Sequence, residues 1–136
     1  MIGLDTNVLV RYLTKDDALQ SPLALELIDS FTSQKPGFVS LVSLVETVWV
    51  LTDVLGYNRT DMAQVIETLL GSDDIHIQQA DLVWRCLRQY RDSKVDFSDC
   101  VIGVLGTEAG CETTVTFDRQ AAKLPGFRLL GSRNLQ

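Results

Sequence analysis

The sequence predicts an α/β fold in which a mostly parallel sheet of four to five strands lies between two layers of helices, a three-layer α/β/α arrangement. Short β-branched and apolar runs alternate with longer amphipathic segments along the whole chain. That alternation is typical of parallel strands joined by helical crossovers. No internal repeat or linker interrupts it, so we expect one domain over residues 1–136, long enough to bury a substantial core.

The opening stretch, MIGLDTNVLVRYL, changes its apolar period at an acidic residue. Ile2–Asp5 is predicted to form a short buried strand, whereas the apolar residues from Val8 onward recur at helical spacing. Asp, Thr and Asn side chains accept hydrogen bonds from the free N–H groups of a helix start. We therefore expect a strand-to-helix turn at Asp5, Thr6 and Asn7.

The remaining elements follow from the same change of period and from residues typical of helix ends. Pro22 lies near the start of one predicted helix, and Gly56 and Gly110 close two others, positions that suit proline and glycine. We expect helices over Leu19–Phe31, Leu41–Gly56, Thr60–Leu70, Ala80–Tyr90 and Phe97–Ala109, and strands at GFVS, IHIQ, TTVTF and FRLL.

Composition and motifs exclude several classes of protein. No apolar run approaches the ~20 residues that span a bilayer, and the N-terminus lacks the features of a signal peptide, so we expect a cytoplasmic protein with no membrane partner. The cysteines form no CxxC motif, and GxxxxGK[ST], GxGxxG and GxSxG are absent. Zinc-site, phosphate-loop, dinucleotide-binding and serine-hydrolase interpretations therefore lack support.

The charge is unevenly distributed. A net charge of −6 argues against generic nucleic-acid binding, although carboxylates that hold divalent cations add negative charge without repelling phosphate once loaded. Four basic residues lie within one stretch of ten residues that begins in the helix predicted over Ala80–Tyr90, and basic residues recur just after Asp118. Such a run is more often a solvated helix face than a binding patch. Both interpretations stay open for Arg85, Arg88, Arg91, Lys94 and Arg119.

Four acidic residues are placed by this fold at one edge of the sheet. Asp5 and Asp118 each follow a predicted strand, Glu46 lies in the helix after GFVS, and Asp99 lies in the first turn of the helix before TTVTF. In parallel α/β sheets ligands bind outside the carboxyl ends of the strands. We therefore expect these four carboxylates to meet there.

Each acid also has a structural explanation. An aspartate at a helix start can simply cap the helix, and we interpret Asp96 mainly in that way. Glu46 could share a narrow polar stripe with Ser43 and Asp53, but the rest of its helix is apolar, and isolated burial of a charge would be costly. Capping explains one aspartate easily, and four acids on different elements less easily.

The motifs together resemble the PIN-domain family, and within it the short VapC-like toxins of bacterial toxin–antitoxin pairs. The resemblance is carried by LDTNVLVRYL, VSLVETVWVL, DFSDCVIG and TVTFDRQAAKLPGFRLL, in family order and spacing over nearly the whole chain. Gly103 and Gly106 stand where the family tends to place alanine, a departure expected to affect helix stability more than chemistry.

The resemblance implies a PIN-like fold and a metal-dependent endoribonuclease with Asp5, Glu46, Asp99 and Asp118 as catalytic and metal-binding acids. Carboxylate ligands suit Mg²⁺ or Mn²⁺, which would polarise the scissile phosphate. Thr6, Asn7 and Thr116 match positions where the family often has supporting polar residues. Asp96 matches an acid that is common in the family but less constant.

The same resemblance implies a cognate antitoxin protein, and a homodimer is common for such toxins. The helix that carries Glu46 has more apolar residues than one face can bury, so we expect docking surface at Val42, Val45, Val50 and Leu51.

Other interpretations remain for the same acids. A PIN-fold RNA-processing nuclease without an antitoxin and a non-catalytic PIN interaction module both stay open. A haloacid-dehalogenase-like phosphatase would need an aspartate at position 7, where Asn7 stands. A receiver-type phospho-acceptor domain would need adjacent acids after the first strand and a lysine after a late one, and neither is present.

Overall fold

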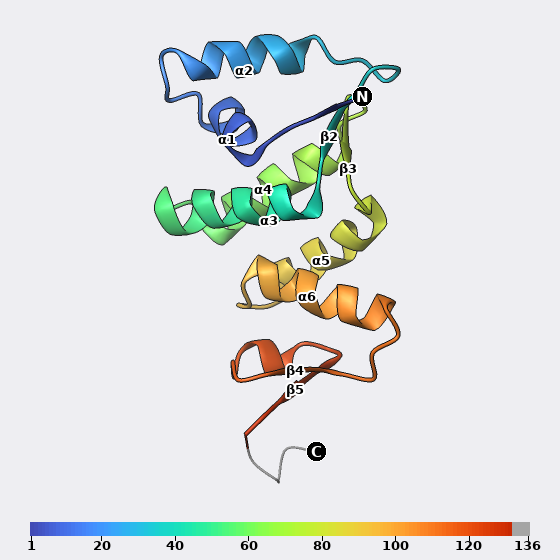
Figure 1. Cartoon of the computed structure of the whole chain (residues 1–136). Coiled ribbons are helices and arrows are strands. Elements are labelled where there is room, and N and C mark those ends of the chain that lie inside the picture. The colour runs from blue at the N-terminus through green and yellow to red at the C-terminus, as the bar shows by residue number, and fades with distance from the viewer. Residues whose placement is uncertain (132–136) are drawn as a thin grey trace. The chain divides into compact units, whose positions relative to one another are not determined.

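The computed structural model describes residues 1–131, and the chain divides into two compact units, Met1–Ala80 (unit 1) and the part from Asp81 onward (unit 2). Figure 1 labels the elements of both. Each unit is described by itself below.

Unit 1 is built on a three-stranded parallel sheet in the order β1-β2-β3. Its strands are β1 (Ile2–Gly3), β2 (Gly37–Val39) and β3 (Ile75–Ile77). Ile2 pairs with Gly37, and Gly37 pairs in turn with Ile75. Because all three strands run in one direction, helices must return the chain between them. Leu4 directly continues β1, and its N–H donates to the Phe38 carbonyl (2.8 Å).

Four α-helices complete unit 1, two between each pair of successive strands (Figure 1). Helix α1 packs against both α2 and α3, and α4 packs against β3. The helices are α1 (Thr6–Thr14), α2 (Gln20–Asp29), α3 (Leu41–Trp49) and α4 (Arg59–Leu70). Their buried faces supply the core of unit 1, in which Leu9, Val39, Leu44, Leu51, Met62 and Ile66 are almost fully enclosed.

The helix predicted over Leu41–Gly56 consists of two parts. After α3 the chain enters a π-helical turn, η1 (Val50–Val54), and the Leu55 N–H donates to the Val50 carbonyl (3.0 Å). Gly56 then takes a φ of +77°, which a residue without Cβ adopts at little cost. The predicted end at Gly56 is therefore confirmed, whereas the π-helical turn was not predicted. Such turns occur often at functional sites.

As far as Gly131, where the described residues end, unit 2 contains two helices, a second sheet and a short helical turn. Helices α5 (Ala80–Asp92) and α6 (Phe97–Glu108) precede strands β4 (Thr114–Thr116) and β5 (Phe127–Leu129), with a 3₁₀ turn η2 (Ala121–Lys123) between the strands. Strands β4 and β5 pair in parallel, so η2 and its flanking loops form the crossover. Where α5 gives way to α6, the rings of Tyr90 and Phe97 meet edge to face, with centroids 5.7 Å apart.

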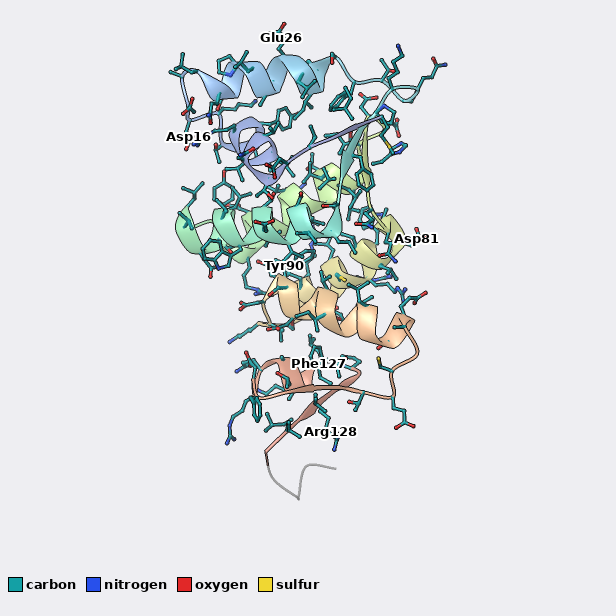
Figure 2. The ribbon with its side chains drawn as sticks, viewed as in Figure 1. Asp16, Glu26, Asp81, Tyr90, Phe127 and Arg128 are labelled. Carbon is teal, nitrogen blue, oxygen red and sulfur yellow. The ribbon has the colours of Figure 1, made fainter. Side chains whose placement is uncertain are left out.

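Gly103 makes room for a side chain of the second sheet. A Cβ at this position would collide with the ring of Phe127, which lies on β5 (Figure 2). Gly106 is similar, because a Cβ there would collide with Thr114 Oγ1. These two glycines therefore hold α6 close to the β4–β5 sheet, a packing role that the sequence did not reveal.

The predicted α/β class with parallel strands is confirmed. The five strands that the described residues form match the upper end of the predicted four to five, and they are distributed over one sheet in each unit. Within residues 1–131, no helix is long and apolar enough to cross a membrane.

Candidate metal centre

Asp5 begins helix α1 and uses one carboxylate oxygen to do so. The Thr6 N–H donates to Asp5 Oδ1 (2.8 Å), so the aspartate is a true N-cap, as expected from the opening motif. The side chain is nevertheless exposed. Beside it, Thr6 Oγ1 is buried and makes no hydrogen bond to any described residue. A buried hydroxyl without a partner is costly unless a ligand or water satisfies it.

Glu46 lies on α3 and shares an open groove of about 530 Å³ with Asp5. Thr6 and Asn7 also line this groove, and the π-helical turn contributes Val50 to its wall. The sequence led us to expect little solvent access for Glu46. It is in fact exposed, because α3 buries only one narrow face.

Arg11 is a residue of this groove that sequence reasoning missed. It pairs with Asp16 (3.5 Å) and donates from Nε to Gln20 Oε1 (2.8 Å), while both Arg11 and Asp16 line the groove beside Asp5. The label of Asp16 in Figure 2 marks this end of α1. The only signal in the sequence was the position of Arg11 on the helix that Asp5 begins.

Asp96 and Asp99 lie at the start of α6 in unit 2. Asp96 occupies the predicted N-cap position, although its side chain makes no capping hydrogen bond. Asp99 lies in the first helical turn and is partly buried. Burial raises the pKa of the Asp99 carboxyl above its ordinary value of 3.8, and the charges of Asp118 and Asp96 raise it further.

Asp118 follows β4 and organises the turn after it. Its Oδ1 accepts from the N–H groups of Gln120 (2.7 Å) and Ala121 (3.1 Å), and its own N–H donates to Thr116 Oγ1 (3.0 Å). Asp118 is therefore a cap as well as a candidate ligand, and Thr116 fixes its backbone. The carboxylate stays exposed.

The structure thus brings the four predicted acids together in two pairs. Asp5 and Glu46 share the groove of unit 1, and Asp99 interacts electrostatically with Asp118 in unit 2. Over residues 1–131, no three His, Cys, Asp or Glu side chains gather as a metal site would require. That all four serve one centre stays a prediction.

The donor chemistry of both pairs fits a hard divalent cation. All four candidate ligands are carboxylates, and an unsatisfied hydroxyl lies beside Asp5. Oxygen ligands and retained water suit Mg²⁺ and Mn²⁺. Within the described chain, no Lys or Arg forms an ion pair with Asp99 or Asp118, so no cationic side chain compensates their negative charge.

Only some of the predicted basic residues line a common groove. Arg85, Arg88 and Lys94 line one groove of unit 2, whereas Arg91 and Arg119 are not among the residues that line it. The groove adds Lys123, which sequence reasoning did not select. Its place five residues after Asp118, across a short helical turn, was the signal that could have identified it.

Comparisons with known proteins agree with the resemblance in the motifs. The family model described as PIN domain matches residues 2–126, across both units. A VapC ribonuclease of Aquifex aeolicus (strain VF5) is 28% identical over 130 residues, which cover 92% of each chain. The crystal structure of Mycobacterium tuberculosis VapC20, described as a sarcin-ricin loop cleaving toxin, is 20% identical. Its match covers 90% of this chain and 93% of VapC20, with a TM-score of 0.45.

Proposed function

Since this chain belongs to the PIN domain family, we propose that it is a metal-dependent endoribonuclease that hydrolyses RNA phosphodiester bonds. The observation that carries the proposal is the partly buried Asp99 with Asp118 and Asp96 near it. Burial first, and then the charges of those two aspartates, raise the pKa of the Asp99 carboxyl, and no Lys or Arg among the described residues forms an ion pair with it. Such crowding costs stability in the free protein, and a divalent cation would relieve it.

The proposal assigns the metal ligands to both units. Asp5 and Glu46 from unit 1 and Asp99 and Asp118 from unit 2 would hold Mg²⁺ or Mn²⁺. When bound, the cation would polarise the scissile phosphate and make a water molecule easier to deprotonate. This requires the two units to act as one nuclease domain, and the family match across residues 2–126 supports that requirement.

The polar neighbours have distinct tasks in this proposal. Thr116 and the N–H groups of Gln120 and Ala121 fix the orientation of Asp118 before substrate arrives. The Asp5 carboxylate has one oxygen in the α1 cap, which leaves the other for the metal. Thr6 Oγ1, satisfied by no described residue, could donate to a phosphate oxygen or a water.

We also propose that the protein acts in the cytoplasm as the toxin of a toxin–antitoxin pair and forms a homodimer. The VapC ribonuclease relative and the exposed apolar residues of α3 support this. Val42 is 69% exposed and Trp49 57% exposed, while Val45 and Val50 are half-buried. The docking role predicted for Leu51 is wrong, because that side chain is fully buried.

An RNA cleavage assay tests the catalytic proposal. Purified protein is incubated with total cellular RNA and Mn²⁺ or Mg²⁺, with EDTA as the metal-free control. We expect cleavage that EDTA abolishes and Asp118→Asn removes, whereas Asp73→Asn, at an exposed loop carboxylate outside both pairs, retains it. Cleavage that persists in EDTA would contradict the metal mechanism.

Light scattering and co-purification separate the toxin from the two alternatives. A dimer that binds a small protein encoded beside it supports the toxin. An active monomer without such a partner indicates an RNA-processing nuclease. A folded protein that cleaves no RNA with any divalent metal indicates an interaction module.

A further inference from the structure

Unit 2 carries an open groove of about 850 Å³ between α5 and the turn that follows Asp118. Its lining comes from two segments. Arg85, Arg88 and Lys94 belong to the first, and Gln120 and Lys123 belong to the second. These segments are residues 85–95 and 120–125, so the groove lies entirely within one unit.

The charge of this groove is opposite to that of the whole protein. Four basic side chains line it against a single carboxylate, that of Asp92, in a chain whose net charge is −6. A basic patch on an acidic protein is not explained by composition. Clefts lined by one sign of charge concentrate ligands of the other sign.

Most of these cations are not used inside the protein. Arg85 forms an ion pair with Glu108 (3.0 Å), which holds its guanidinium in place. In the part of the chain that the structure describes, Arg88, Lys94 and Lys123 form no ion pair and are exposed. Three exposed cations around one groove are therefore available to a polyanion.

The groove is also tied to the candidate metal site. Asp118 Oδ1 accepts from the Gln120 and Ala121 N–H groups, and this cap holds the short turn that carries Lys123. A polymer lying along Lys123 would thus approach the segment that Asp118 organises.

We propose that this groove binds the phosphate backbone of RNA, with Arg88, Lys94 and Lys123 as the phosphate contacts. The inference rests on the proposed ribonuclease function and extends it, because it names where the substrate is held. Lys123 is a substrate-positioning residue in this proposal. Arg91 and Arg119, which the sequence also suggested, are left outside the contact set.

RNA binding measured without catalysis tests the proposal. Fluorescence anisotropy in EDTA, with a short fluorescein-labelled single-stranded RNA, is recorded over a series of salt concentrations. The variants are Arg88→Gln, Lys94→Gln, Lys123→Gln and the triple substitution. Lys35→Gln, at an exposed lysine of unit 1, is the matched control for loss of one positive charge.

We expect each single variant to weaken binding by up to about fivefold, because exposed ionic contacts are worth at most about 1 kcal/mol. The slope of log K against log salt should fall by about 0.7 for each contact removed. Lys35→Gln should bind as the wild type does, and Lys123→Arg should keep the salt slope. Thermal melts confirm that every variant is folded.

Three results would overturn the proposal. The first is a folded triple variant that keeps the affinity and salt slope of the wild type. The second is a wild type that binds no RNA at low salt. The third is displacement of RNA from the groove by polyglutamate at equal charge concentration. Cleavage by wild type with unchanged binding by the triple variant would refute the groove alone. Groove-dependent binding without cleavage in any divalent metal would refute the nuclease alone.

Discussion

In unit 1, Asp5 and Glu46 line an open groove with Arg11 nearby, whereas in unit 2 Asp99 is partly buried and interacts with two further aspartates. The charge of Asp5 is offset in part by the helix N–H that it caps. Asp99 has no such compensation, and its pKa is raised. We infer that Asp99 in unit 2 would gain more from a bound cation than Asp5 in unit 1.

Replacing one acid from each pair tests whether both belong to one catalytic centre. Asp5→Asn and Asp118→Asn should each lower the rate of RNA cleavage by more than about a hundredfold, since even indirect partners of metal ligands contribute ten- to a hundredfold. Initial rates with Mn²⁺ measure the loss. Asn can still accept the capping hydrogen bonds, so the melts should change little. A large loss in one variant only would mean that one pair works alone.

Overpacking at Gly103 tests whether the crowded pair depends on the packing of unit 2. A valine there would drive into the Phe127 ring and separate α6, with Asp99, from the β4–β5 sheet that leads to Asp118. Gly103→Val should lower the free energy of unfolding by about 2–3 kcal/mol. Urea titration measures it. Gly3→Val, where a Cβ meets no atom within 4 Å, is the control. Equal losses in both variants would refute this packing role.

The helix N-caps of the two units should also differ in how much they contribute to stability. Ser40 Oγ accepts from the Ser43 N–H (3.1 Å) at the start of α3, so Ser40→Ala should cost about 1 kcal/mol. Asp96 makes no such bond at the start of α6, and its negative charge repels that of Asp99. Asp96→Ala should therefore cost clearly less. Thermal melts compare them, and an equal cost would show that Asp96 caps α6 in solution.

Local patterns predicted the elements well because most have strong end signals. The helix expected over Thr60–Leu70 is found at Arg59–Leu70, and the strand expected in IHIQ is found at Ile75–Ile77. The π-helical turn after α3 was missed, because a change from α to π hydrogen bonding over one turn leaves no signal in the apolar period.

The candidate site was predicted less evenly. Position along strands and helices correctly placed Asp5 at a helix start, but exposure and contacts depend on tertiary packing. Glu46 is therefore exposed against expectation, and Lys123 joins Arg88 only across a groove of the folded unit. Sequence periodicity carries no information on such neighbours.

The smallest expected effect is the pH dependence of Asp99→Asn. The folded state raises the pKa of Asp99 above the 3.8 of an ordinary aspartate, so the charged form is disfavoured in the folded protein. The cost is fully present above the raised pKa and disappears as pH falls below 3.8. In the absence of metal, Asp99→Asn should therefore raise the Tm slightly near neutral pH, and the gain should vanish in acid.

The same thermal melts, repeated with Mn²⁺, test whether Asp99 is a metal ligand. Millimolar Mn²⁺ should raise the Tm of the wild type near neutral pH, because a cation that binds the folded state stabilises it. Asp99→Asn should show a smaller shift, since one ligand is lost. Asp73→Asn should respond as the wild type does, because this loop carboxylate lies outside both acid pairs. If Asp99→Asn and the wild type shift equally with Mn²⁺, Asp99 is not a ligand, and its raised pKa reflects burial and its acidic neighbours alone.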